Sequence, residues 1–140
     1  MKNLRLGLFL LSCTAIMCMA QTTDFFILTH CADSCYMEGA YAAASAYYGK
    51  ALACGEAGSN NYYNAACCAA KAGQTDEAFH RLNTLLERFP EWYSRRLDAD
   101  ADLQVLHSDA RWAAVAGESQ VRYTRAVAAY EHPLYDQLMA

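Results

Sequence analysis

Apolar residues recur every three or four positions along most of the chain, a spacing that is typical of amphipathic α-helices. Tyr48 and Ala51 follow this spacing in one segment, and Leu82 and Leu85 follow it in another. The chain contains no run of β-branched residues and only two prolines. Because strands favour β-branched residues, the pattern predicts an all-α fold of antiparallel helices without a sheet.

Two segments, 38–51 and 72–85, align when one is shifted by 34 residues. The alignment pairs Gly39 with Gly73, Ala44 with Ala78, Tyr48 with Leu82, and Ala51 with Leu85. Each glycine is expected to end a helix, since glycine adopts the left-handed backbone without steric strain. Each alanine is expected where two helices cross closely, since a larger side chain would push them apart. The chain is therefore predicted to fold as repeated helix–turn–helix units.

The segment after these units is expected to close the helical stack, because two units alone bury little surface. Glu91 to Leu97 is predicted to form a short helix, which the acidic run Asp98-Ala99-Asp100 ends. Four apolar residues further along are predicted to be buried across a short turn: Leu103, Leu106, Trp112 and Val115.

Helical spacing of apolar residues then continues up to Tyr130. We expect one long amphipathic helix from about Asp109 to Tyr130, with Ser108 or Asp109 as its N-terminal cap. It should end near His132-Pro133, because the residue before a proline disfavours the helical conformation.

The first twenty residues have the layout of a secretory signal peptide. Lys2 and Arg5 give a positively charged start, and a nearly continuous apolar stretch follows from Leu6 to Met17. Cleavage is expected after Ala20, which leaves residues 21–140 as an exported domain, periplasmic or secreted. No apolar stretch reaches the roughly 20 residues that a transmembrane helix needs.

An alternative interpretation of the same segment is a bacterial lipoprotein signal. Leu10-Leu11-Ser12-Cys13 resembles the processing site of such proteins. Cys13 would then carry a lipid, and the protein would be anchored to a membrane.

Charge excludes two classes of partner. The net charge is −4, and removal of residues 1–20 takes Lys2 and Arg5 but no acid, which leaves a charge of −6. The chain has no basic stripe for nucleic acid and no polybasic segment for anionic lipid.

Five cysteines lie beyond the predicted signal peptide: Cys31, Cys35, Cys54, Cys67 and Cys68. An odd number leaves at least one thiol without an intramolecular partner. Buried cysteines behave as small apolar residues, and core packing is the expected role. A disulfide between Cys31 and Cys54 is an alternative, because a helical hairpin brings the start of one helix near the end of the other.

The period and residue pattern resemble the tetratricopeptide repeat. The repeats would span 25–58 and 59–92, with a capping segment over 93–140. The second repeat carries the family's positions well, at Tyr62, Ala65, Ala66, Gly73, Ala78, Leu82, Leu85 and Pro90. The first repeat departs from them at Leu28, Cys31, Ala32, Cys35 and Glu56. The alternative is a pair of unrelated helical hairpins with coincident glycines.

The resemblance implies a protein or peptide partner bound on the concave face of the first helices. The family's groove positions fall on Phe26, Thr29, Asp33, Tyr36, Met37, Asn60, Tyr63, Asn64, Cys67 and Lys71. Asn64 matches an asparagine that often bonds the ligand backbone in this family. Lys71 is the only basic residue of the set, so clamping of an acidic C-terminus is not expected. An apolar or basic partner segment fits better.

No catalytic or cofactor-binding motif stands out, and we expect neither a metal nor a cofactor. His30 and Cys31 would point about 100° apart on a helix. Asp98, Asp100 and Asp102 lack the glycine and the distal glutamate of a calcium loop, and are interpreted as a capping and linker cluster. The predicted function is a cell-envelope adaptor or assembly subunit. The alternative is a thiol-dependent or metal-dependent envelope enzyme.

Overall fold

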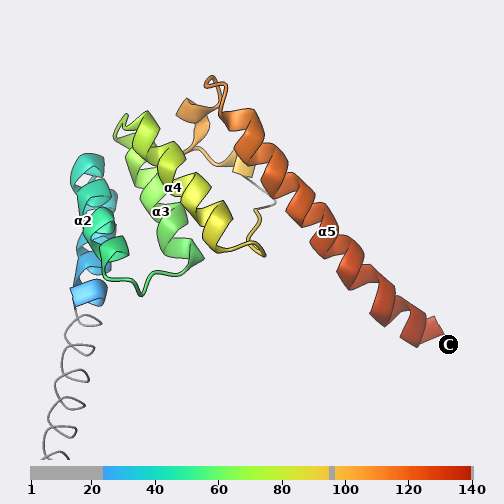
Figure 1. Ribbon diagram of the computed structural model, residues 1–140. Helices are drawn as coiled ribbons and strands as arrows, with labels where there is room; N and C mark the ends of the chain where they lie inside the picture. Colours follow the sequence, from blue (N-terminus) through green and yellow to red (C-terminus); the bar gives the residue numbers. More distant parts are fainter. Residues whose placement is uncertain (1–23, 95–96, 140) are drawn as a thin grey trace, which may run out of the picture.

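The computed structural model describes residues 24–94 and 97–139, with side chains up to residue 129. Within these ranges the chain is helical and contains no strand (Figure 1). The elements are a helix over residues 24–37, α2 (Tyr41–Ala53), α3 (Ser59–Lys71), α4 (Thr75–Arg88), η1 (Leu97–Ala99), η2 (Gln104–Leu106) and α5 (Trp112–Met139). The prediction of an all-α fold is confirmed. The predicted signal peptide and Cys13 lie outside the described residues.

The same turn follows helix 24–37 and α3. Gly39 and Gly73 have φ angles of +75° and +73°, the left-handed conformation that glycine adopts without strain. The next residue then donates a backbone hydrogen bond back over the last helical turn, from Ala40 to the Cys35 carbonyl and from Gln74 to the Ala69 carbonyl (2.8 and 2.9 Å). Both predicted glycine turns are therefore confirmed, and each satisfies helix-end carbonyls.

Helix α3 lies between α2 and α4 and presents small residues to both (Figure 1). Ala44 on α2 and Ala78 on α4 are fully buried, as expected at close helix crossings. The predicted inner stripe is also buried: Tyr48, Ala51, Leu82 and Leu85. The helical periodicity thus identified the core of this part of the molecule.

One buried cation joins three helices. Arg81 on α4 is only 5% exposed, and its guanidinium donates to the Ala65 carbonyl of α3 at 2.8 Å and the Ser45 carbonyl of α2 at 3.1 Å. Glu77, one turn earlier on α4, accepts from Arg81 Nε at 2.7 Å. A Cβ on Gly49 would stand 3.4 Å from this guanidinium, so the glycine leaves room for it. The charge is therefore buried with its donors satisfied.

The segment after α4 does not contain the predicted helix over Glu91–Leu97. Its described residues up to Ser94 are not helical, and a short 3-10 turn, η1, begins at Leu97. Trp92 instead packs against the apolar core, and the Ser94 amide donates to Ser119 Oγ of α5 at 3.0 Å. Tertiary contacts thus take the place of helical hydrogen bonds here.

The four apolar residues predicted to be buried beyond this point are buried: Leu103, Leu106, Trp112 and Val115. Trp112 Nε1 donates to Asp98 at 3.1 Å, and the indole stacks on His107 with ring centroids 4.3 Å apart. These contacts seat residues 97–112 on α3 and α4.

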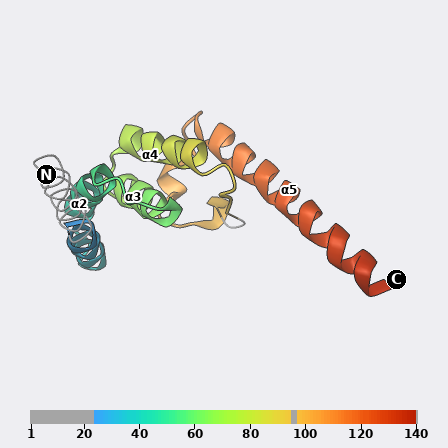
Figure 2. The ribbon, with the colours of Figure 1, turned by 60° about the horizontal axis from the view of Figure 1, so that its bottom comes forward.

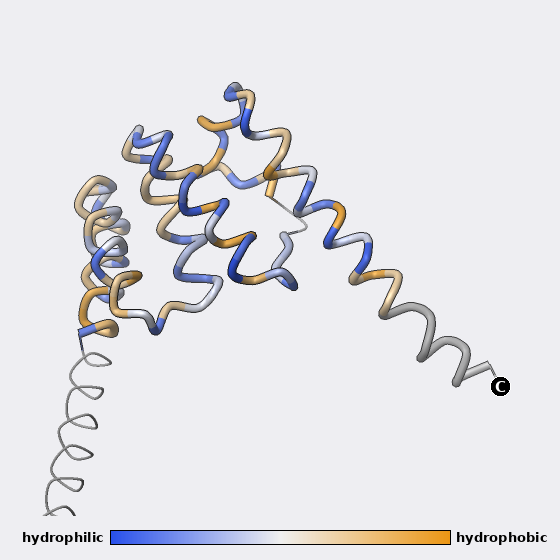
Figure 3. Tube along the Cα trace, viewed as in Figure 1, coloured by the Kyte–Doolittle hydropathy of each residue, from blue (hydrophilic) through white to orange (hydrophobic). Residues whose placement is uncertain are grey.

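Helix α5 is attached by its N-terminal part and projects away from the other helices (Figures 1 and 2). Arg122 donates to the carbonyls of Leu86 and Phe89 at 2.9 and 3.0 Å. These carbonyls lie at the end of α4, where intrahelical donors are missing. Hydrophilic and hydrophobic residues alternate along α5 up to residue 129 (Figure 3). None of the described helices is long and apolar enough to cross a membrane.

The predicted bounds of this last helix were wrong at both ends. It begins at Trp112 rather than Asp109, whose carboxylate accepts from the Arg111 amide just before the helix at 2.9 Å. It continues to Met139 and so includes Pro133. A proline removes one helical hydrogen bond but leaves the others along the helix, so it does not by itself end a long helix.

Replacement of Arg81 by methionine should destabilise the protein strongly. Arg81→Met keeps the length of the side chain but removes the guanidinium hydrogen bonds to the Ala65 and Ser45 carbonyls. A hydrogen bond to a charged group contributes about 1.5–3 kcal/mol, so we expect the free energy of unfolding to fall by about 3 kcal/mol. Urea unfolding followed by circular dichroism measures this change.

Arg111→Met is the matched control. The ion pairs of Arg111 with Asp76 and Asp109 are solvent-exposed and screened by water. The urea concentration at the unfolding midpoint of this variant should therefore stay close to that of the parent protein. Equal midpoints for the two variants would show that the buried guanidinium does not hold the helices together.

Candidate functional site

A cavity of about 250 Å³ lies where three helices meet the loop between η1 and η2. Polar and aromatic side chains line it: Asp33 and Tyr36 from helix 24–37, Tyr48 from α2, Tyr63, Asn64, Cys67 and Cys68 from α3, and Asp100 and Asp102 from the loop. The cavity is thus assembled from four segments that are distant in the sequence.

Three tyrosine–aspartate pairs organise this cavity. The phenol of Tyr36 donates to Asp102 Oδ2, that of Tyr48 to Asp33 Oδ1 and that of Tyr63 to Asp100 Oδ2, each at 2.5 Å. Each pair joins two different segments, so the bonds hold the walls of the cavity together.

The surroundings raise the pKa values of all three phenols. Burial and the bond to Asp100 raise the pKa of Tyr63 well above its usual range, and burial and Asp33 do the same to the pKa of Tyr48. The hydrogen bond to Asp102 is the main cause of the raised pKa of Tyr36. All three therefore remain hydrogen-bond donors at physiological pH.

The cavity carries an excess of negative charge. Three carboxylates line it, whereas no lining residue is cationic. Lys71 stands at the margin, with Nζ 3.8 Å from Asp102 Oδ1 and 5.0 Å from the centre of the Tyr41 ring. Lys71 also borders a wider hollow of about 550 Å³, which Asp102 shares. One cation therefore faces several acids, and the site favours a positively charged ligand.

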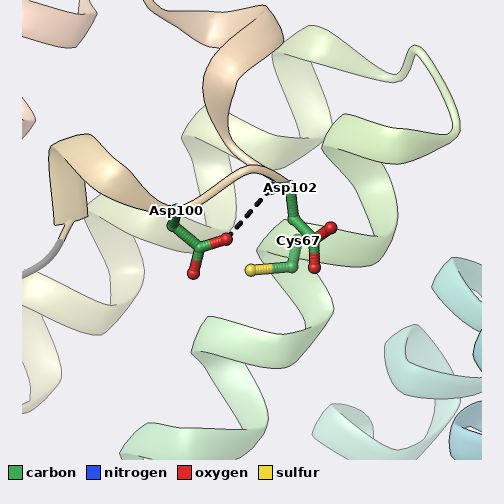
Figure 4. A group of neighbouring side chains, drawn as sticks. All are labelled: Cys67, Asp100 and Asp102. Carbon is green, nitrogen blue, oxygen red and sulfur yellow. Dashed lines mark hydrogen bonds between the residues drawn. The ribbon is translucent and has the colours of Figure 1, made fainter.

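Three of the lining residues, Cys67, Asp100 and Asp102, form a tighter group (Figure 4). The Cys67 sulfur and one oxygen of each carboxylate lie within 4.8 Å of one another. The Asp102 amide donates to Asp100 Oδ1 at 3.0 Å, which fixes the two acids relative to each other. Such a set of thiol and carboxylate ligands is one that could hold a metal ion.

Half of the groove residues predicted from the sequence meet in the cavity: Asp33, Tyr36, Tyr63, Asn64 and Cys67. Lys71 lies at its margin. Phe26 and Met37 are 64% and 83% exposed, and Asn60 is also exposed, away from the cavity. Thr29 Oγ1 donates to carbonyls of its own helix. The structure thus brings five of the ten predicted residues together, with Lys71 at the margin, and leaves the other four apart.

Four lining residues were not predicted as site residues from the sequence: Tyr48, Cys68, Asp100 and Asp102. Tyr48 was predicted only as a core residue, although its hydroxyl reaches the cavity and accepts from Asn64 Nδ2 at 3.3 Å. Asp100 and Asp102 were interpreted as linker residues. The alternation of acidic residues at positions 98, 100 and 102 was a signal in the sequence. No local pattern, however, indicated that this loop packs against α3.

The two buried thiols, Cys67 and Cys68, are shifted away from nucleophilic activation. Burial raises the pKa of Cys67 well above its usual range and raises the pKa of Cys68 to about 11. A cysteine nucleophile needs the opposite shift. All five cysteines that the structure describes are free thiols, Cys31 and Cys54 included.

Comparison with known proteins assigns this chain to no family. The chain matches no family model, no curated protein and no solved structure. Its function must therefore be argued from the geometry and chemistry of its own residues.

Alkylation should divide the cysteines into two groups. In the reduced native protein at neutral pH, Cys31, Cys35 and Cys54 are partly exposed and should react first. Cys67 and Cys68 should react only after unfolding, because they are buried and their raised pKa values disfavour the thiolate. Mass spectrometry of labelled peptides, with urea-unfolded protein as control, measures this order. Labelling of Cys68 as fast as Cys31 would contradict it.

Proposed function

We propose that this chain is an exported protein- or peptide-binding module of the tetratricopeptide type, acting as a cell-envelope adaptor or assembly subunit. The repeated turn after helix 24–37 and after α3 supports this proposal. Gly39 and Gly73 have the same backbone conformation there, and the residues that follow them make the same hydrogen bonds. Helix α5 would act as the cap of the stack, since Arg122 covers the end of α4.

The cavity is the observation that carries the proposed binding role. It is a preformed hollow lined by three tyrosines and three aspartates, beside the exposed amide of Asn64. Its volume of about 250 Å³ is below the range of about 300–1,000 Å³ found for drug-sized ligands, and suits one side chain of a partner.

The chemistry of the cavity favours a basic partner segment over an apolar one. The charge of a lysine or arginine side chain could pair with the carboxylates and lie over the phenol rings. Its methylene groups could pack against the same rings. Asn64 can both donate to and accept from a peptide main chain. We therefore propose that a partner inserts a basic side chain between Asp33 and the Asp100–Asp102 loop.

A random peptide library tests this proposal, because it offers the cavity side chains of every chemical class at once. Immobilised random hexapeptides should select sequences with lysine or arginine, and added salt should weaken their binding. Asp33→Asn and Asn64→Ala should each cost about 2 kcal/mol of binding free energy, as for anchors at the centre of an interface. Titration of a selected, labelled peptide by fluorescence anisotropy measures this loss.

His80→Ala is the control, because His80 is exposed on α4 and does not line the cavity. Affinity equal to that of the parent is expected for this variant. Selection of acidic or purely apolar peptides, or equal losses in all three variants, would contradict the proposed site.

The proposed export of the protein predicts the first residue of its mature chain. If residues 1–20 are a signal peptide, the mature chain begins at Gln21 outside the cytoplasm. Intact-mass spectrometry of protein purified from its native host measures the first residue. A mass that starts at an acylated Cys13 would instead establish the lipoprotein alternative.

A further inference from the structure

The Cys67 thiol lies between the apolar core and two carboxylates. The residue is 5% exposed, and its sulfur faces the carboxylates of Asp100 and Asp102 (Figure 4). A thiol that only filled space would be expected against apolar groups. The two carboxylates beside this sulfur therefore point to a ligand.

The two carboxylates are held in place by donors on their outer sides. Asp100 accepts from the Tyr63 phenol and from the Asp102 amide. Asp102 accepts from the Tyr36 phenol. In metal sites, ligating carboxylates are oriented by hydrogen bonds of this kind, which leave other lone pairs for the ion. Lys71, 3.8 Å from Asp102, compensates only part of the negative charge.

The spacing of the three groups suits one small ion. Ligands at about 2.0–2.3 Å from a tetrahedral ion lie about 3.5 Å from one another. The sulfur and the two oxygens are already within 4.8 Å, so side-chain movements of about 1 Å would complete the set.

We propose that Cys67, Asp100 and Asp102 bind one divalent transition-metal ion of the zinc class, with its fourth position open to the cavity. A thiolate with two carboxylates favours Zn²⁺ or Co²⁺ over Ca²⁺ and Mg²⁺, which take oxygen ligands only. The ion replaces the thiol proton, which passes to water as the sulfur–metal bond forms. The bound ion fastens the Asp100–Asp102 loop to α3.

This metal site does not require the peptide-binding role. Its ligands come from α3 and the loop, whereas Asp33 and Asn64 stay available to a partner. Because the ion would occupy two of the three carboxylates, it should also compete with a basic side chain for the cavity.

Cobalt is the probe, because a cobalt–thiolate bond gives a charge-transfer absorption that oxygen ligands do not. The purified, reduced protein, without peptide, should take up one Co²⁺ per chain with this absorption, and excess Zn²⁺ should abolish it. Cys67→Ser should lose the charge-transfer absorption. Tyr63→Phe, which removes one of the two donors to Asp100, should keep the absorption but weaken affinity about 10–100-fold, as for other positioning residues around metal ligands.

Cys68→Ser is the matched control. Cys68 is the neighbouring buried thiol on the same cavity wall but is not part of the ligand group. This variant should bind cobalt as the parent does, and circular dichroism checks that every variant is folded. Asp100→Asn gives a second test of the ligands with the thiol intact, and should weaken binding at least as much as Tyr63→Phe.

Three results would overturn the proposal. They are no cobalt uptake beyond that of Cys67→Ser, a charge-transfer absorption that Cys68→Ser abolishes but Cys67→Ser keeps, or binding of Ca²⁺ in preference to Zn²⁺. None of these results depends on peptide affinity, so failure of the metal site and failure of the proposed binding role are distinguishable.

Discussion

The buried guanidinium of Arg81 is the constraint on which the helical packing depends. A charge at this position is stable only while its donors are satisfied, and two of the acceptors are main-chain carbonyls of α2 and α3. Any slide of one helix against another would break these bonds. Alanines at the crossings and Gly49 beside the guanidinium allow the close approach that this geometry needs. Arg122 uses the same chemistry to attach α5 to α4.

The cavity follows from that packing. With α2, α3 and helix 24–37 held in place, Tyr48 and Asn64 face each other across the α2–α3 contact and Asp33 accepts from Tyr48. The loop between η1 and η2 then adds two more acids, which accept from Tyr36 and Tyr63. Neutral phenols stabilise carboxylates without neutralising them, so negative charge remains for a ligand. A basic side chain and a metal ion are the two kinds of cation that this arrangement supports.

The sequence by itself determined the local features of the molecule. Helical periodicity predicted the all-α fold and the buried stripe that includes Leu82 and Leu85, because a helix repeats within a few residues. Gly39 and Gly73 predicted the two left-handed turns, because the backbone angle depends on the residue itself. The resemblance to the tetratricopeptide repeat placed Tyr63, Asn64 and Cys67 of α3 among the predicted groove residues, but not Cys68 on the same helix.

The tertiary structure alone decided the features that join distant segments. Tyr36 is 66 residues from Asp102, and Tyr63 is 37 residues from Asp100, so no local pattern links them. The same holds for the segment after Pro90, where contacts with α5 replace the predicted helix, and for the length of α5 itself. Local propensity sets which backbone states are open to a segment, whereas burial and hydrogen bonds to distant groups choose among them. Asp100 and Asp102 became site residues for that reason, through the return of their loop to α3.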